Sequence, residues 1–191
     1  MRALAFGLSA LIALTGCAAS AQSDPMATTP ATPLSRGEML AGALAQAASA
    51  EQAGDRRALS HAVGVIDRLG AHPLDGADDA VSPWRTVALQ DMPPLRGRPL
   101  GPGYRSGRIP AGGTESISQL FLSGTGASIA LSAPNGGRVA MRVIDPQAKT
   151  VCKGEANHGG TCRWVPLFTQ RYTIEVANLG AEDVRYFLVV E

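Results

Sequence analysis

The sequence predicts a mainly β protein, an antiparallel β-sandwich or jelly roll preceded by an α-helical hairpin. Two observations support this fold class. In residues 111–191, short runs that alternate apolar and polar side chains are separated by turn residues about every eight to twelve positions. In residues 34–70, apolar residues instead recur at three- and four-residue spacing, which is the period of a helix. The two segments are therefore expected to form different layers of structure.

Residues 34–70 carry start and stop signals for two helices. Ser35 and Glu38 form the pattern of a capping box, in which each side chain accepts a hydrogen bond from the backbone N–H of the other residue. Gly54 ends the first predicted helix, and Asp55 is placed to cap the second. A hairpin of about 35 residues is below the size that usually folds unaided. We therefore expect it to pack, either on the sandwich or on a partner protein.

Residues 71–110 contain seven prolines and five glycines, too many for a continuous helix or a central strand. We interpret this segment as a connector that runs over the surface of the domain. Pro83 stands at the first position of one short predicted helix. We expect Trp84, in that helix, to be buried under the connector rather than to bind a ligand.

Residues 111–191 hold the predicted strands. The clearest alternation of apolar and polar side chains is in residues 172–176, and residues 186–190 repeat it. Between two earlier runs, Pro134-Asn135-Gly136-Gly137 is typical of a turn that joins neighbouring strands in a hairpin. We therefore expect short strands separated by turns, as in an antiparallel sandwich or jelly roll.

Three motifs stand in this part of the chain: a strand that ends in Asp145-Pro146, a Tyr-x-Ile-x-Val-x-Asn strand at residues 172–178 and a Tyr-x-Leu strand at residues 186–188. Together they resemble the bacterial pre-peptidase C-terminal domain over residues 111–190. The resemblance implies a β-sandwich that serves as an accessory module without catalytic activity. Gly137-Arg138 stands where members of that family often carry paired acidic residues, so the resemblance does not extend to a calcium site.

Residues 1–16 combine one basic residue, Arg2, with an apolar run too short to span a bilayer, as a signal peptide does. Leu14-Thr15-Gly16-Cys17 is similar to the lipobox of bacterial lipoproteins, which implies cleavage before Cys17 and a lipid on that residue. Ala19-Ser20-Ala21 also fits the ordinary signal peptidase, with cleavage before Gln22, and this alternative stays open. An odd number of cysteines in an exported protein favours the lipid, because lipidation uses the third one.

Residues 17–33 are small and polar with several prolines, and we interpret them as a flexible tether between the membrane and the domain. Ala18 is not the Asp that is associated with inner-membrane retention in lipoproteins. By that resemblance we expect an outer-membrane lipoprotein that faces the periplasm of the cell envelope.

Cys152 and Cys162 bracket a polar, glycine-rich loop. In an oxidising envelope compartment this spacing predicts a disulfide that clamps two adjacent strands of a hairpin. The alternative is a zinc site in which Glu155 and His158 join the two thiolates, although tetrahedral zinc sites favour closer cysteine spacings.

The sequence lacks the Gly-x-Ser-x-Gly, His-Glu-x-x-His and nucleotide-binding fingerprints that mark common active sites. Its three histidines, His61, His72 and His158, are scattered between a predicted helix, the connector and a loop. We therefore expect no catalytic residues, no cofactor and no metal. A hydrolase built from distant loops is the weakest alternative.

Once residues 1–16 are removed, basic and acidic residues are equal in number. The chain therefore lacks the excess positive charge that is the main driving force for binding nucleic acid. We expect a non-catalytic envelope lipoprotein that acts as a binding or assembly module, with the membrane and another envelope protein as partners. A glycan-binding sandwich is the alternative, because jelly rolls often present exposed aromatic rings to sugars. Trp164, Tyr104 and Tyr172 are the candidates for that site.

Overall fold

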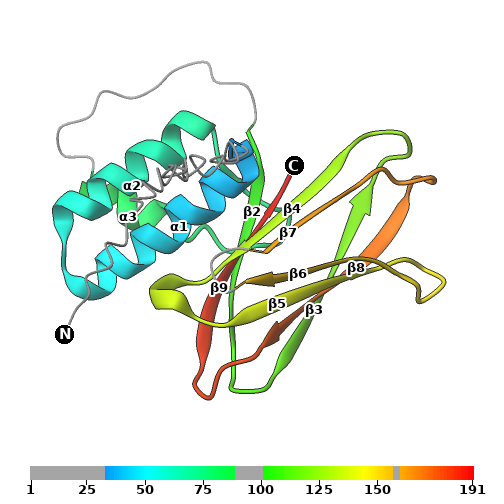
Figure 1. The fold of residues 1–191 in the computed structure, drawn as a ribbon. Helices are drawn as coiled ribbons and strands as arrows, with labels where there is room; N and C mark the ends of the chain where they lie inside the picture. Colours follow the sequence, from blue (N-terminus) through cyan, green and yellow to red (C-terminus); the bar gives the residue numbers. More distant parts are fainter. Residues whose placement is uncertain (1–32, 89–100, 157–159) are drawn as a thin grey trace, which may run out of the picture. The chain divides into compact units, whose positions relative to one another are not determined.

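The structure, a computed structural model, describes residues 33–88, 101–156 and 160–191 (Figure 1). Residues 33–191 fall into one compact unit. The expected signal peptide, the lipid site at Cys17, the alternative cleavage site at Gln22 and most of the tether lie outside the described residues, as do His158 and the side chain of Glu155. No helix in the described part of the chain is long and apolar enough to cross a membrane.

The helical hairpin forms as its capping residues predict. Helix α1 spans Arg36–Ala53, and its first turn is closed by the capping box: the Glu38 amide donates to Ser35 Oγ (3.2 Å) and the Ser35 amide donates to Glu38 Oε2 (2.7 Å). Gly54 ends α1 in the left-handed conformation, with φ 67°. Helix α2 spans Arg56–Leu69 and begins at Asp55, whose side chain accepts from the Ala58 amide (3.0 Å).

The segment predicted as a surface connector contributes more to the fold than its composition indicates. It holds strand β1 (His72–Pro73), helix α3 (Ser82–Ala88) and strand β2 (Gly103–Ile109), and β2 pairs along its whole length with the last strand of the chain. The sandwich thus begins before residue 111. Trp84, in α3, is buried as expected.

Two antiparallel sheets pack face to face, which confirms the predicted fold class. One has the strand order β1-β2-β9-β4-β7, with a short parallel pairing of β1 and β2 at its edge; the other has the order β3-β8-β5-β6. The remaining strands are β3 (Thr114–Phe121), β4 (Ala127–Ser132), β5 (Val139–Ile144), β6 (Thr150–Ala156), β7 (Gly160–Trp164), β8 (Gln170–Asn178) and β9 (Val184–Val190).

The prediction of a hairpin at residues 134–137 is wrong. A short 3-10 turn, η1 (Pro134–Gly136), carries the chain from β4 in one sheet to β5 in the other. Asn135 and Gly136 do take left-handed conformations, with φ 54° and 71°. The strands they join cannot pair, however, because β4 is already bonded on its two edges by β7 and β9.

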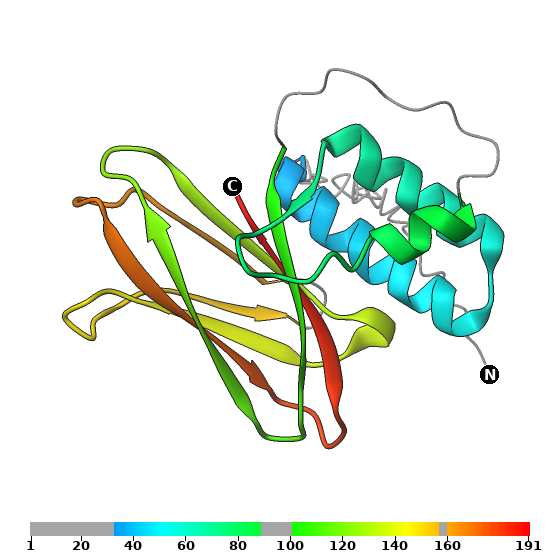
Figure 2. The same ribbon diagram turned by 180° about the vertical axis from the view of Figure 1, so that it is seen from behind.

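The helical hairpin docks on the sandwich, which decides between the two expected docking surfaces. Figures 1 and 2 show the three helices together beside the sheet that contains β9 and β4. One apolar cluster lies between helices and sheet and another lies between the two sheets. Strand β9 is buried on both faces, since Phe187 and Val189 join the helical cluster while Tyr186 and Leu188 join the inter-sheet cluster.

Candidate functional site

Two loops meet at one end of the sandwich. One joins β3 to β4 (residues 122–126) and the other joins β7 to β8 (residues 165–169). The register brings them together, because Phe121 at the end of β3 pairs with Gln170 at the start of β8, and Ala127 at the start of β4 pairs with Trp164 at the end of β7. We call these two loops the loop end; they lie at the upper right of Figure 1.

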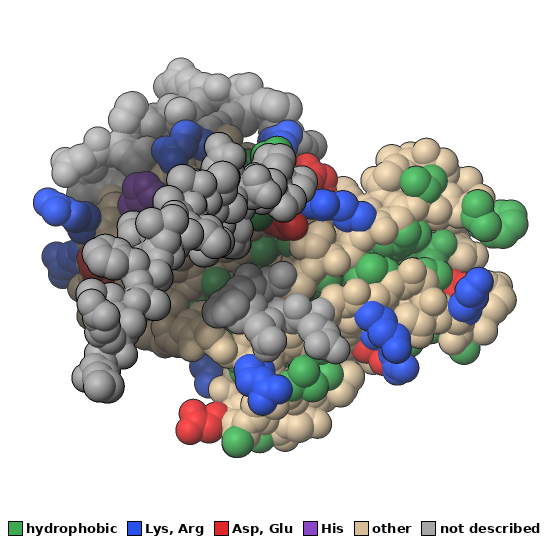
Figure 3. Space-filling view, viewed as in Figure 1, with side chains coloured by type: hydrophobic (Ala, Val, Ile, Leu, Met, Phe, Trp, Pro, Cys, Tyr) green, Lys and Arg blue, Asp and Glu red, His purple; other side chains and the backbone are tan. Residues whose placement is uncertain are grey.

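The loop end gathers exposed apolar side chains. Five of the nine large apolar side chains that are exposed in the described residues lie in these loops or beside them: Leu120, Leu122, Val165, Leu167 and Phe168. Leu167 is 81% exposed and Phe168 is 68% exposed, so neither contributes to the core. Figure 3 shows apolar side chains at this end of the molecule. Large apolar side chains that gather at one end of a folded domain, rather than lying singly over its surface, mark a candidate binding surface.

Hydrogen bonds between the two loops fix their conformation. The Ser123 amide donates to Thr169 Oγ1 (3.0 Å), the Ser123 hydroxyl donates to the Leu167 carbonyl (2.8 Å), and the Gly124 amide donates to the Pro166 carbonyl (2.9 Å). Gly124 has φ 72°, a conformation that side-chain-bearing residues rarely adopt. The apolar side chains are therefore presented from a preorganised base, which lowers the entropy lost on binding.

An aromatic cluster supports the loops from inside the sandwich. The rings of Phe121, Trp164 and Tyr172 meet edge to face, with centroids 4.8 to 5.8 Å apart. Phe121 and Trp164 are the residues from which the two loops depart, so their packing fixes where each loop begins.

A cavity of about 530 Å³ adjoins the loop end. It lies between the start of α1 at Ser35, the beginning of β4 at Gly126 and Ser128, and the end of β7 at Trp164 and Val165. Two polar atoms of its lining residues, Trp164 Nε1 and Ser128 Oγ, are buried without a hydrogen-bond partner in the described part of the chain. Such atoms are unusual in folded proteins, and here both are enclosed by protein rather than exposed in the cavity.

Glu38 joins the start of α1 to the edge strand β7 beside this cavity. Its carboxylate accepts hydrogen bonds from the Thr161 hydroxyl (2.8 Å) and from Arg163 Nη2 (2.6 Å), in addition to the Ser35 amide. The Ser35 N–H and these two side chains hold the pKa of Glu38 below its usual value against the opposing effect of burial. The contact therefore fastens the helix to the sheet in the ionised state.

Of the three aromatic residues predicted for a glycan site, Trp164 and Tyr172 are in ring contact, whereas Tyr104 lies on the other face of the sheet. Tyr104 is only 1% exposed, on the helical side of the sheet, and its hydroxyl donates to Asp79 Oδ1 (2.6 Å). Burial raises the pKa of Tyr104. Burial also opposes ionisation of Asp79, but hydrogen bonds from Tyr104 and from backbone amides outweigh it and lower the pKa of that carboxyl. Tyr172 is 4% exposed. Neither tyrosine presents a ring face to a sugar, and the expectation of exposed rings is wrong for both.

Trp164 is half-buried and lines the cavity described above. The exposed aromatic ring at this end belongs to Phe168, which sequence reasoning missed. The signal was available, since Val165-Pro166-Leu167-Phe168 is an apolar run placed where a turn between strands should be polar.

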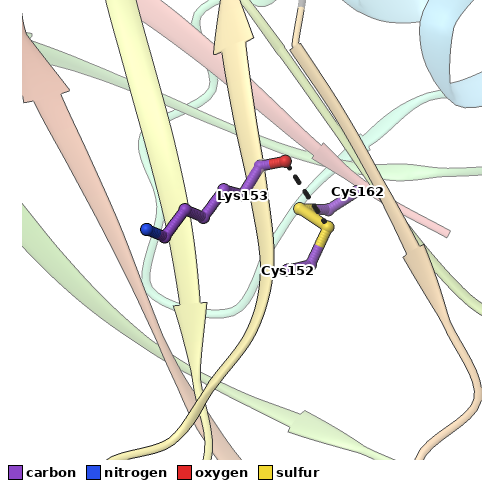
Figure 4. Close-up of a disulfide and its surroundings, with 3 residues drawn as sticks. All are labelled: Cys152, Lys153 and Cys162. Atoms are coloured by element: carbon purple, nitrogen blue, oxygen red, sulfur yellow. Dashed lines mark hydrogen bonds between the residues drawn. A yellow bond between two sulfur atoms is a disulfide. The ribbon is translucent and has the colours of Figure 1, made fainter.

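The predicted disulfide between Cys152 and Cys162 is present, with Cα atoms 5.8 Å apart (Figure 4). The two cysteines lie on β6 and β7, which belong to different sheets, so the bond crosses the sandwich rather than clamping a paired hairpin. Each of these strands is the edge of its sheet, and the covalent link holds the two edges together. The zinc alternative is wrong, since both sulfur atoms are used in the bond.

Two of the domain's other hollows lie away from the loop end. One, of about 810 Å³, lies along α1 and α2 and includes His61; the other, of about 500 Å³, contains Arg108 and Arg138 together with Glu182 and Asp183. Among the described residues, no histidine shares a side-chain hydrogen bond with a hydroxyl or carboxylate, and no three His, Cys, Asp or Glu residues are placed to hold a metal ion.

Comparison with known proteins shows similarity of fold over about half of the chain. No family model and no curated protein matches the sequence. The pre-peptidase C-terminal domain of a Bacillus anthracis collagenase superposes on 47% of this chain and 89% of its own, with 18% identity and a TM-score of 0.41. A periplasmic inhibitor of g-type lysozyme from Aeromonas hydrophila, PliG, covers 47% of this chain and 84% of its own, with 16% identity and a TM-score of 0.38.

The Salmonella Typhimurium PliG, also a periplasmic inhibitor of g-type lysozyme, covers 47% of this chain and 89% of its own, with 11% identity and a TM-score of 0.33. These are likenesses of fold alone.

Proposed function

We propose that the protein is a non-catalytic binding module of the bacterial envelope, held to a membrane by a lipid on Cys17, and that the loop end is the surface through which it binds. The observation that carries this proposal is the exposure of Leu122, Val165, Leu167 and Phe168 on two loops bonded to each other. Exposed apolar side chains on a rigid base lose little entropy when a partner covers them, and burial of each contributes to affinity.

Location in the cell envelope is supported by two independent features. The lipobox-like Leu14-Thr15-Gly16-Cys17 follows a signal-like apolar run, and the Cys152–Cys162 disulfide is typical of oxidising, extracytoplasmic compartments. The disulfide uses two of the three cysteines, which leaves Cys17 available for the lipid.

The non-catalytic part of the proposal is supported by how the polar side chains are used. His61 is exposed on α2 and His72 lies on the two-residue strand β1, in separate parts of the domain. The Asp67 and Glu38 carboxylates pair with Arg85 and Arg163, in contacts that join one structural element to another.

In-cell photo-crosslinking at two positions tests the proposal. A photoreactive amino acid replaces Phe168 in one variant and Leu179 in the other; both residues are exposed and apolar, but they lie at opposite ends of β8. We expect crosslinked envelope components, whether protein or lipid, at position 168 and a much weaker yield at position 179. Equal yields at the two positions, or adducts at position 179 alone, would overturn the loop end as the binding surface.

A second candidate function is binding of a small polar ligand, such as a glycan fragment, in the cavity beside Trp164. The half-buried Trp164 ring that lines the cavity favours it, and a ligand oxygen could accept from the enclosed, unpartnered Trp164 Nε1 or Ser128 Oγ after a side-chain movement. Titration of Trp164 fluorescence with envelope glycans tests this candidate, with the Trp84→Phe variant used to remove the signal of the other tryptophan. A saturable change that Ser128→Ala weakens supports it; no change with any glycan contradicts it.

A further inference from the structure

The chemistry of the loop end indicates what covers it. We infer that the loop end inserts into the surface of a bilayer that contains anionic phospholipid. Because this is the same surface as that proposed above, the inference rests on the proposed function and adds the identity of the partner.

The side chains have the character of an interfacial anchor. Leu122, Leu167 and Phe168 project from loops that connect strands, so they can enter the boundary between lipid headgroups and acyl chains without rearranging the sheets. Each such side chain that leaves water for the acyl region gains free energy in proportion to its apolar area.

Several backbone polar groups of the loops are already hydrogen-bonded within the protein, as a medium with little water requires. The Ser123 and Gly124 amides are bonded to acceptors in the opposite loop, the Ser123 hydroxyl is bonded to the Leu167 carbonyl, and Pro166 has no N–H to satisfy. Unsatisfied backbone groups are the main cost of placing a loop in a bilayer. These contacts remove much of that cost.

The two loops carry no charged residue, and the charges near them are of both signs: Arg163 is paired with Glu38, and Glu191 lines the cavity beside Val165. No acidic residue occurs between Glu115 and Asp145 or between Gly160 and Glu175, whereas Arg163 and Arg171 lie on the strands that border the loops. Arg171 is exposed and forms no ion pair with a described residue. Arg171 is therefore the basic side chain beside the loops that can meet an anionic headgroup, which attracts arginines.

The chain leaves the domain at this same end. Ser35, which begins α1, and Val165, in the loop end, line one cavity, and the exposed Leu34 precedes Ser35. Residues 18–33 reach at most roughly 55 Å when extended. A lipid on Cys17 would therefore leave the loop end within reach of the bilayer, and insertion would add a second membrane contact to the first.

Vesicle flotation of the full chain carrying Cys17→Ser, which removes the lipid acceptor, tests the inference. The probes are vesicles of phosphatidylethanolamine with phosphatidylglycerol and vesicles of phosphatidylcholine alone. We expect flotation with the first and little with the second. Phe168→Asp should reduce the bound fraction about tenfold or more, and Arg171→Glu should reduce it less. Leu179→Asp, the matched control at the other end of β8, should leave it unchanged.

Three results are distinguishable. Flotation lost in Phe168→Asp and kept in Leu179→Asp supports the inference. No flotation of the parent, combined with crosslinking in cells at position 168 to a protein only, overturns the lipid partner and leaves the loop end as a protein-binding surface. Equal behaviour of Phe168→Asp and Leu179→Asp in both the flotation and the crosslinking experiment overturns the inference and the proposed function together.

Discussion

The two ends of the sandwich are closed by different chemistry. At the loop end an aromatic cluster underlies apolar side chains that face outward. At the opposite end, which we call the polar end (residues 110–113, 133–138 and 179–183), Asn178 is buried and its Nδ2 donates to the carbonyls of Ile109, Pro110 and Glu182. Hydrogen bonds fasten the loops at both ends, but only the loop end also leaves several large apolar side chains exposed.

This difference separates stability from function. Substitution at the polar end should affect folding and leave binding intact, whereas substitution of the exposed loop residues should affect binding and leave folding intact. Leu179 serves as the control position, because it is a single exposed apolar side chain beside the polar network.

The largest effect on stability is expected at Asn178. Replacement by Leu removes four hydrogen bonds, including that from the Gly180 amide to Asn178 Oδ1 (2.8 Å). The partner groups are then buried without a hydrogen bond. We expect the free energy of unfolding to fall by about 3 kcal/mol, measured by urea denaturation. The folded variant should still float with vesicles, and a folded variant that does not would show that the two ends are coupled.

Removal of the disulfide should have the next largest effect. Cys152→Ala with Cys162→Ala should lower the free energy of unfolding by about 2–3 kcal/mol, because the bond closes a loop of about ten residues. Since β7 is an edge strand that leads directly to the loop end, amide exchange should accelerate more in residues 165–169 than in residues 179–183. Equal acceleration at the two ends would argue against this local role.

Glu38→Gln should lower the free energy of unfolding by about 1 kcal/mol near pH 7. The folded pKa of Glu38 lies below its ordinary value of 4.5, so its contribution is present above that value and is lost as the pH falls through the folded pKa. Thermal unfolding of the parent and the variant should therefore differ near neutrality and converge in acid. A difference that stays constant down to pH 3 would rule out the ionised carboxylate as the source.

The smallest effects on stability are expected at the exposed apolar residues. Phe168→Asp and Leu167→Asp should each change the free energy of unfolding by less than about 0.5 kcal/mol, because both side chains lie outside the core. Thermal melts beside those of Leu179→Asp check this. A loss of several kcal/mol at Phe168 would mean that the loop holds the fold together rather than offering a surface.

The sequence predicts the helices better than the sheets for a physical reason. A capping box involves residues three apart, so Ser35 and Glu38 specify their own contact. Which sheet a strand joins depends on partners far along the chain. The turn at residues 134–137 has hairpin geometry at Asn135 and Gly136, yet β4 is already paired on its two edges by β7 and β9.

The candidate site was missed for a related reason. Tyr104 and Tyr172 are candidates because they are aromatic, but long-range packing buries them. No local sequence pattern shows which rings stay exposed. The disulfide pairing could be predicted from cysteine count and compartment, whereas its path between sheets could not, because the pairing partners of β6 and β7 are not local.

Amide hydrogen exchange of the lipidated protein in isolated envelope membranes tests the central claim most directly, with soluble protein carrying Cys17→Ser as the reference. Burial of the loop end on its partner predicts slower exchange in residues 122–126 and 165–169 of the membrane-held protein, with residues 179–183 unchanged. Protection of residues 179–183, or no difference between the two samples at the loop end, would contradict the claim that this end is the binding surface.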